Sequence, residues 1–355
     1  MILHPRPSPI AAAMYQLRDV GVDAIILHGP AGCCFRTARL LELDGVRVFT
    51  SAMDENDFIF GAMDKLRRTI EEVIEYLKEH KNDGNYMIGI VGTCASMIIG
   101  EDIWSVVDEY DATLIPVEVH SGLNDNTIGA INAMESCLKL GLIDEKEFER
   151  QKYMLKKATE IEKKRGMAKS KYIKPTYEDD LKDVIELFKN NMNKNPKVAC
   201  VLNAKKETAY LFAHPLIKIN EIFNNCINIG NLDENIGLKK IREDAKNILR
   251  EFKVDYITGG LDEYPVTGEK AVEILKEIKP DIVVVSGVPH ALPIEELKEE
   301  VDCITIGVSD GPRLYYPIKE YYDYAVIELD AHAKVLGKRE VVKSRFGEIL
   351  EYALK

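Results

Sequence analysis

The stretch Ile25-Ile26-Leu27-His28-Gly29-Pro30-Ala31-Gly32-Cys33-Cys34-Phe35-Arg36 joins an apolar run to a glycine–proline turn and a pair of cysteines. Gly and Pro end the run and let the backbone bend sharply. The residues from Thr37 to Glu42 read as a helix. A thiol at a helix N-terminus lies near the positive end of the dipole and ionises more readily. The stretch therefore predicts a strand, a tight turn and a reactive Cys33.

A second stretch, Val91-Gly92-Thr93-Cys94-Ala95-Ser96-Met97-Ile98-Ile99-Gly100-Glu101-Asp102-Ile103, repeats this layout of strand, glycine turn, cysteine and helix. Parallel strands end at the same edge of a sheet, where α/β proteins bind their ligands. We therefore expect Cys33 and Cys94 to form one site. Cys34, one position further along, is an alternative to Cys33.

The rest of the chain alternates apolar strands with amphipathic helices. This pattern indicates parallel sheets covered on both faces, so we predict two doubly wound, Rossmann-like α/β domains facing a cleft. The predicted domains are residues 1–170, which carry the cysteine turns, and 195–355, with a linker and helix at 171–194. Predicted strands are 22–27, 46–50, 86–91, 113–119, 198–203, 226–230, 256–259, 281–287, 303–308 and 324–329. Continuous helices are expected over 54–80 and 97–108.

Composition narrows the class of protein. The net charge of −12 and the lack of a basic stripe argue against nucleic-acid binding. No apolar run approaches the ~20 residues that span a bilayer, and no signal-peptide pattern opens the chain, which predicts a cytoplasmic protein with no membrane partner. Seven cysteines, an odd number, do not read as a disulfide framework.

Iron–sulfur clusters use four thiolates, and one chain offers two at matching positions. A homodimer would supply Cys33 and Cys94 twice and close a 4Fe–4S site on its two-fold axis. The sequence contains no G-x-x-x-x-G-K-[ST] motif. If ATP drives the chemistry, another polypeptide must bind it with its magnesium ion.

Polar groups at the ends of other predicted strands are candidate catalytic residues. His120 closes the fourth strand, His290 follows the turn after Gly287, and Arg313 follows the strand that ends near Val308. Together they would give a cleft with proton donors and a cation for carboxylates.

The two cysteine stretches carry a family resemblance. Gly29-Pro30-Ala31-Gly32-Cys33 and the run from Cys94 to Ile103 are similar to the second and third cluster-cysteine motifs of the nitrogenase molybdenum–iron protein α subunit. No cysteine precedes Gly29 and none matches the cofactor anchor, so an eight-iron cluster and dinitrogen reduction are not expected. The chain therefore resembles a shortened nitrogenase component 1.

With Thr50 to Asp57 and the Pro-rich start, the pattern is most similar to the nitrogenase-like D components of methanogens. That resemblance implies a part in the reductive cyclase of nickel-sirohydrochlorin a,c-diamide, on the route to the nickel tetrapyrrole coenzyme F-430. It implies a homodimeric ATPase iron protein as electron donor, a 4Fe–4S cluster at Cys33 and Cys94, six-electron ring reduction and γ-lactam closure.

Two alternatives remain open at this point. The chain could be a non-catalytic scaffold that carries a cluster or a tetrapyrrole, or a two-domain metabolite-binding protein whose cysteines are core residues. An iron-free preparation would favour the second alternative.

Overall fold

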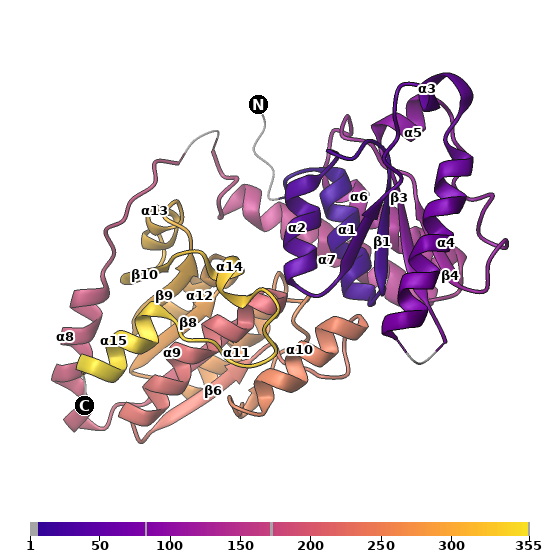
Figure 1. Cartoon of the computed structure of the whole chain (residues 1–355). Helices are drawn as coiled ribbons and strands as arrows, with labels where there is room; N and C mark the ends of the chain where they lie inside the picture. The colour runs from indigo at the N-terminus through magenta and orange to yellow at the C-terminus, as the bar shows by residue number, and fades with distance from the viewer. Residues whose placement is uncertain (1–5, 82–83, 171–172, 354–355) are drawn as a thin grey trace. The chain divides into compact units, whose positions relative to one another are not determined.

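The computed structural model describes residues 6–81, 84–170 and 173–353. Its described residues form two compact units. One, here called the cysteine unit, holds residues 6–156 and 238–240, and the second unit holds 157–237 and 241–353. Each unit is built on a single parallel sheet flanked by helices (Figure 1). The predicted α/β class with two parallel-sheet domains is therefore confirmed.

The sheet of the cysteine unit has the strand order β2-β1-β3-β4, and every pair of neighbours is parallel. Leu27 pairs with Val91 and His28 with Gly92, so β1 and β3 end side by side. The two cysteine turns follow these ends directly. The strands are β1 (Ala24–His28), β2 (Arg47–Thr50), β3 (Met87–Gly92) and β4 (Thr113–Val117).

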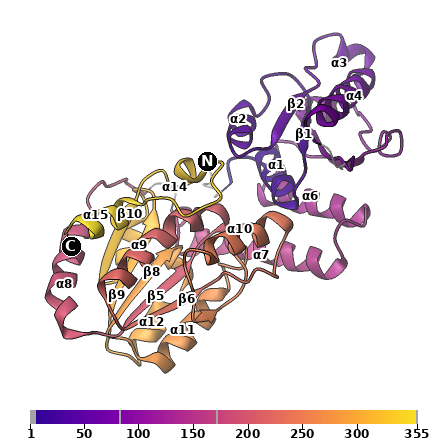
Figure 2. The ribbon, with the colours of Figure 1, turned by 60° about the horizontal axis from the view of Figure 1, so that its bottom comes forward.

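Alternating side chains of the central strand β1 build two separate cores. Ile25 and Leu27 face α1, α2 and α6, whereas Ala24 and Ile26 face α4. Both faces of this sheet are thus covered (Figures 1 and 2), as expected for an apolar parallel strand. The helices are α1 (Pro9–Val20), α2 (Phe35–Leu43), α3 (Asp57–Phe60), α4 (Met63–His80), α5 (Cys94–Ile98), α6 (Thr127–Lys139) and α7 (Glu145–Lys164), which continues into the second unit.

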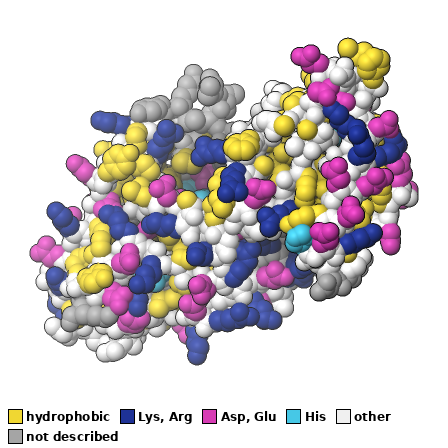
Figure 3. Space-filling view, viewed as in Figure 1, with side chains coloured by type: hydrophobic (Ala, Val, Ile, Leu, Met, Phe, Trp, Pro, Cys, Tyr) yellow, Lys and Arg dark blue, Asp and Glu magenta, His cyan; other side chains and the backbone are white. Residues whose placement is uncertain are grey.

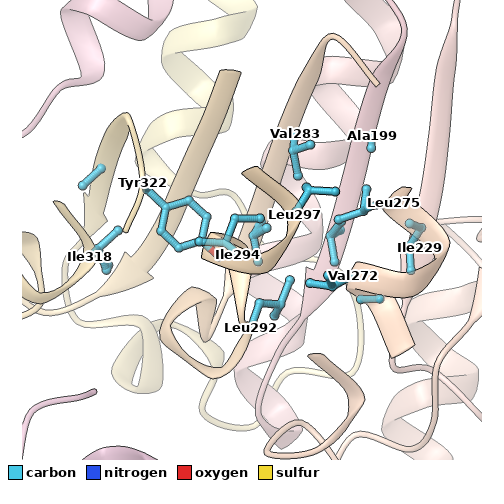
Figure 4. Packing of buried hydrophobic residues seen from close by; sticks show 14 of the residues in the cluster. Ala199, Ile229, Val272, Leu275, Val283, Leu292, Ile294, Leu297, Ile318 and Tyr322 are labelled. Atoms are coloured by element: carbon cyan, nitrogen blue, oxygen red, sulfur yellow. The ribbon is translucent and has the colours of Figure 1, made fainter. Parts of the chain in front are cut away.

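The sheet of the second unit is also parallel throughout, in the order β10-β9-β8-β5-β6-β7. On one face, Val283 and Val285 of β8 pack with Leu275 and Leu297 in the core drawn in Figure 4. The strands are β5 (Val198–Asn203), β6 (Cys226–Gly230), β7 (Tyr256–Ile257), β8 (Ile282–Gly287), β9 (Ile304–Asp310) and β10 (Tyr324–Glu328). Each predicted strand is present, with its ends within two residues of the expected ones.

Two acidic side chains from the segment before α8 accept hydrogen bonds from the backbone of the outer strand β10. Ala325 N–H donates to Asp180 Oδ2 at 2.8 Å and Ile327 N–H to Asp179 Oδ2 at 3.0 Å. These bonds occupy donors that an edge strand would otherwise expose. The helices of this unit are α8 (Leu181–Asn191), α9 (Ala209–Ile222), α10 (Lys239–Leu249), α11 (Thr267–Ile278), α12 (Ile294–Lys298), α13 (Tyr315–Lys319), α14 (Ala331–Val335) and α15 (Arg345–Ala353), with 3-10 turns η1 (Met192–Lys194), η2 (Lys206–Thr208) and η3 (Pro289–Ala291).

Two helix predictions were wrong. The helix expected over 54–80 is divided into α3 and α4 at Gly61, whose φ of +87° lies in the left-handed region. The helix expected over 97–108 is instead the short α5 followed by turns, because Gly100 has a φ of +74°. The two breaks are linked, because Ala62 N–H donates to Glu101 Oε1 at 2.8 Å.

Among the described residues, no helix combines the length and the apolar character needed to cross a membrane.

Candidate metal centre at the two cysteine turns

The first turn positions Cys33 through its own backbone. Cys33 N–H donates to Pro30 O at 2.9 Å, which closes the Gly-Pro-Ala-Gly bend. Cys34 is the N-cap residue of α2. Its φ of +52° is a backbone conformation that residues other than glycine seldom adopt. Both thiols are half-buried against the core under α1 and α2.

The second turn interlocks with the first. Thr93 Oγ1 donates to the carbonyl of His28 at 3.0 Å, directly below the bend. A Cβ on Gly29 would lie 2.2 Å from this Thr93 oxygen, so only glycine fits there. The two cysteine segments are therefore held in contact by a hydrogen bond and by the absence of a side chain.

Cys94 is the first residue of α5, which Thr93 and Ser96 cap reciprocally. Its Sγ accepts a hydrogen bond from Ser121 N–H at 3.2 Å and lies 3.0 Å from Ser121 Oγ. Ser121 comes from the loop after β4, so a third strand end contributes to the site.

The neighbouring thiols of Cys33 and Cys34 shift each other's pKa. A hydrogen bond from Cys34 lowers the pKa of Cys33, burial opposes this, and a hydrogen bond with Thr93 adds to it, which brings the pKa to about 7. The same contact with Cys33 and the burial of its own side chain raise the pKa of Cys34, with a smaller contribution from the charge of Cys94. Thiolates are the form that binds metal.

The remaining cysteines lie elsewhere. Cys137 and Cys200 are buried, whereas Cys226 and Cys303 are half-buried in or next to strands of the second unit. Within residues 6–81, 84–170 and 173–353, no group of three or more His, Cys, Asp or Glu side chains is arranged to hold a metal ion. The described residues therefore hold the two cysteine turns but no complete metal site within one chain.

The three candidate catalytic residues divide between the units. His120 belongs to the cysteine unit, next to Ser121 in sequence, and its Nδ1 accepts Gly122 N–H at 3.1 Å. His290 and Arg313 belong to the second unit. Arg313 is exposed, whereas His290 is buried and its Nε2 lies 3.3 Å from Glu162 Oε1.

Sequence reasoning missed a buried polar group beneath the turns. His28 is fully buried, with Nδ1 3.0 Å from Ser51 Oγ and Nε2 3.2 Å from Glu101 Oε2. The sequence does place a histidine at the end of an otherwise apolar strand. Because a buried imidazole needs polar partners, this histidine indicates a buried polar cluster.

The parallel sheet and its paired cysteine turns lie in the part of the chain that is similar to nitrogenase component 1 proteins. Accordingly, the family model "Nitrogenase component 1 type Oxidoreductase" matches residues 8–164. The chain belongs to the family of the Ni-sirohydrochlorin a,c-diamide reductive cyclase complex components CfbD. It is 72% identical to the Methanocaldococcus jannaschii member over 100% of both chains.

Two more members support this assignment over the whole chain. The protein from Methanothermobacter thermautotrophicus is 52% identical over 99% of each chain. The protein from Methanosarcina acetivorans is 43% identical over 100% of this chain and 98% of that one. The family predicted from the cysteine motifs is confirmed.

Proposed function

We propose that this chain is the cluster-bearing component of a reductive cyclase complex that acts on Ni-sirohydrochlorin a,c-diamide. The observation that carries the proposal is the meeting of the Cys33 and Cys94 turns at one sheet edge. Full-length similarity to proteins named as components of this complex supplies the substrate class.

The residues fit half of a 4Fe–4S site. Each chain has two cysteine turns at one sheet edge, and the thiol of Cys33 has a pKa of about 7, which suits the demand of such a cluster for thiolate ligands. Four thiolates require two chains, so the proposal includes a homodimer with the cluster shared between identical cysteine pairs.

The surface beside the cysteines supports this dimer. Phe35 follows Cys34 and is 70% exposed, and Ile98, in the helix that Cys94 begins, is 78% exposed. Met97 is also exposed. Apolar side chains grouped next to a functional site favour a protein interface.

A bound cluster would supply one-electron transfer at low potential. In the proposed reaction, electrons from a homodimeric ATPase iron protein reduce the ring system by six electrons, and an acetamide side chain closes to a γ-lactam. The ATP and magnesium sites are assigned to that partner, because this sequence carries no phosphate-binding lysine motif.

We assign the chain's own polar residues to the substrate. The exposed Arg313 guanidinium suits the carboxylates of a tetrapyrrole. His120 lies beside the residue that contacts Cys94 and is a candidate proton donor. His290 is a second candidate donor in its protonated form, in which Nε2–H donates to Glu162 and the N–H at Nδ1, which has no partner among the described residues, carries the transferable proton.

Anaerobic turnover tests the proposal. Wild-type protein, the iron-protein ATPase, ATP and a reductant are mixed with Ni-sirohydrochlorin a,c-diamide, and the reduced lactam product is followed by mass spectrometry. We expect turnover by the wild type and by Cys303→Ala, the matched control in the second unit, and none by Cys94→Ala. Iron-loaded wild type that binds the tetrapyrrole without converting it would instead identify a scaffold.

A further inference from the structure

The buried side chains of Ser51, His28 and Glu101, here called the His28 network, join three loops below the cysteine turns. Ser51 follows β2, His28 ends β1, and Glu101 follows α5. Ser51 and His28 are 6% and 0% exposed, and the Glu101 side chain is 5% exposed. None of these residues is needed as a cluster ligand in the function proposed above.

The donor and acceptor of each hydrogen bond in the network can be assigned. Gly29 N–H donates to Ser51 Oγ at 3.1 Å, so the Ser51 hydroxyl is free to donate to Nδ1 of His28. His28 Nε2–H then donates to Glu101 Oε2, while Glu101 Oε1 accepts Ala62 N–H at 2.8 Å. A carboxylate only accepts, so Glu101 assigns the ring proton to Nε2.

Burial keeps the imidazole uncharged. Desolvation lowers the pKa of His28, although the hydrogen bond and charge of Glu101 and the charge of Asp57 oppose it. The network is therefore a set of oriented hydrogen bonds around a neutral ring. Because Ser51 Oγ is buried and already bonded to Gly29 N–H, it is held as a support rather than presented as a nucleophile.

His28 clamps the Cys94 segment at both ends. Its carbonyl accepts a hydrogen bond from Thr93, the residue before Cys94, and its ring is hydrogen-bonded to Glu101, three residues after the end of α5. The same residue leads directly into the Cys33 turn, whose Gly29 N–H is fixed by Ser51. One residue thus connects both cysteine segments.

We propose that His28 and Glu101 are positioning residues that set the spacing between Cys33 and Cys94. The inference rests on the proposed cluster site and adds the groups that align its ligands. Outer hydrogen-bond partners of metal ligands commonly contribute 10- to 100-fold in metal affinity. His28 and Glu101 do not touch the cluster in this account and act through the two turns.

The first test compares His28→Leu with His214→Leu. His214 is a buried histidine whose Nδ1 accepts Ser344 N–H at 3.1 Å, and it belongs to the second unit, so its loss is a matched perturbation outside the cysteine unit. After anaerobic reconstitution, iron release to a chelator is timed at a temperature below the unfolding transitions of all variants. We expect release about 10- to 100-fold faster from His28→Leu only.

A second test does not depend on the folding of His28→Leu, and its NMR measurement needs no iron. In Glu101→Gln, the amide oxygen can still accept Ala62 N–H while the amide nitrogen donates to Nε2, which requires the opposite ring tautomer. Nitrogen-15 NMR of the metal-free protein should show the proton of His28 on Nε2 in the wild type and on Nδ1 in Glu101→Gln. Iron retention should be higher in Glu101→Gln than in Glu101→Leu.

Equal iron release from wild type and His28→Leu, or equal retention by Glu101→Gln and Glu101→Leu, would overturn the positioning role. Wild-type protein that takes up no iron would instead refute the proposed cluster. In that case the tautomer measurement would still report on the network.

Discussion

The two neighbouring thiols Cys33 and Cys34 have opposite acid–base properties although they share one turn. Their mutual hydrogen bond lowers the pKa of Cys33 and raises that of Cys34. The backbone of Cys34 lies in the left-handed region, which glycine adopts more easily, yet the position holds a cysteine. We interpret Cys34 as the donor that prepares Cys33 for metal rather than as the ligand.

The metal-free protein should show this in its alkylation kinetics. We expect Cys33 to react with iodoacetamide with a midpoint near pH 7, the pKa of its thiol. In Cys34→Ala the thiolate loses its donor, so the pKa of Cys33 rises and its rate at pH 7 falls by about tenfold. Peptide mass spectrometry measures the rate of each cysteine.

Cys137 is the internal control, because burial raises the pKa of its thiol to about 12. It should stay unmodified throughout this pH range. A Cys33 profile that is identical in wild type and Cys34→Ala would contradict the assignment.

At the scale of elements, α1 and α6 approach each other most closely at a glycine. A Cβ on Gly129 would lie 1.9 Å from Pro9 O, and that oxygen belongs to backbone that cannot turn aside. The helices would have to separate to admit a methyl group. This contact supports the core under the Cys33 turn.

We therefore expect Gly129→Ala to lower the free energy of unfolding by about 1–3 kcal/mol through overpacking. Gly32→Ala is the matched control, since nothing lies within 4 Å of a Cβ at that position. Urea unfolding monitored by circular dichroism compares the two. Equal stabilities would show that the helices can relax apart without cost.

A second element-scale feature is the end of α7, where Glu162 meets His290 from the turn after β8. Burial alone would raise the pKa of Glu162, but the charge and hydrogen bond of His290, the charge of Lys205 and the N–H of Met167 prevail and lower it to about 2. A carboxyl whose pKa is lower in the folded state stabilises the fold above its unfolded pKa of about 4.3.

Replacing this carboxylate should therefore cost stability in a pH-dependent way. We expect Glu162→Gln to lose about 3 kcal/mol at pH 7. The difference from wild type should stay constant down to about pH 5 and shrink as the pH falls toward 2, where Glu162 itself is protonated. Urea unfolding at pH 7 and pH 3.5 measures it. A difference of the same size at both pH values would refute the ion pair.

At the scale of the whole molecule, the proposed dimer places apolar side chains of two chains against each other. Figure 3 shows hydrophobic side chains on the part of the cysteine unit that carries α3, where Phe60 is 83% exposed. Ile98 lies closer to the ligands, in the same short helix as Cys94.

An aspartate at Ile98 should therefore break the assembly. In a two-fold dimer the substitution appears twice, and burying a charge is costly. We expect Ile98→Asp to weaken self-association by at least about tenfold and to lose iron, as judged by sedimentation and iron analysis. Tyr352→Asp, at an 86% exposed position of α15, is the control. If Ile98→Asp remains a dimer and retains iron, the interface does not include Ile98.

The strands could be predicted from the sequence because a short, wholly apolar run such as 282–287 is typical of a buried parallel strand. The sequence predicted that the turns before Cys33 and Cys94 follow neighbouring strand ends, because parallel strands end at one edge. It did not predict the breaks at Gly61 and Gly100, since the amphipathic pattern continues across each glycine. It also missed His28 and Glu101, because their partnership depends on loops brought together only by the fold.

The central claim is a 4Fe–4S cluster shared by two chains, and native mass spectrometry of the anaerobically reconstituted protein tests it most directly. We predict a dimer with one four-iron, four-sulfide cluster, or about two irons per chain. The cluster should be absent from Cys33→Ala and from Cys94→Ala and retained in Cys34→Ala. A complete cluster on a monomer, or wild-type protein without iron, would contradict the account.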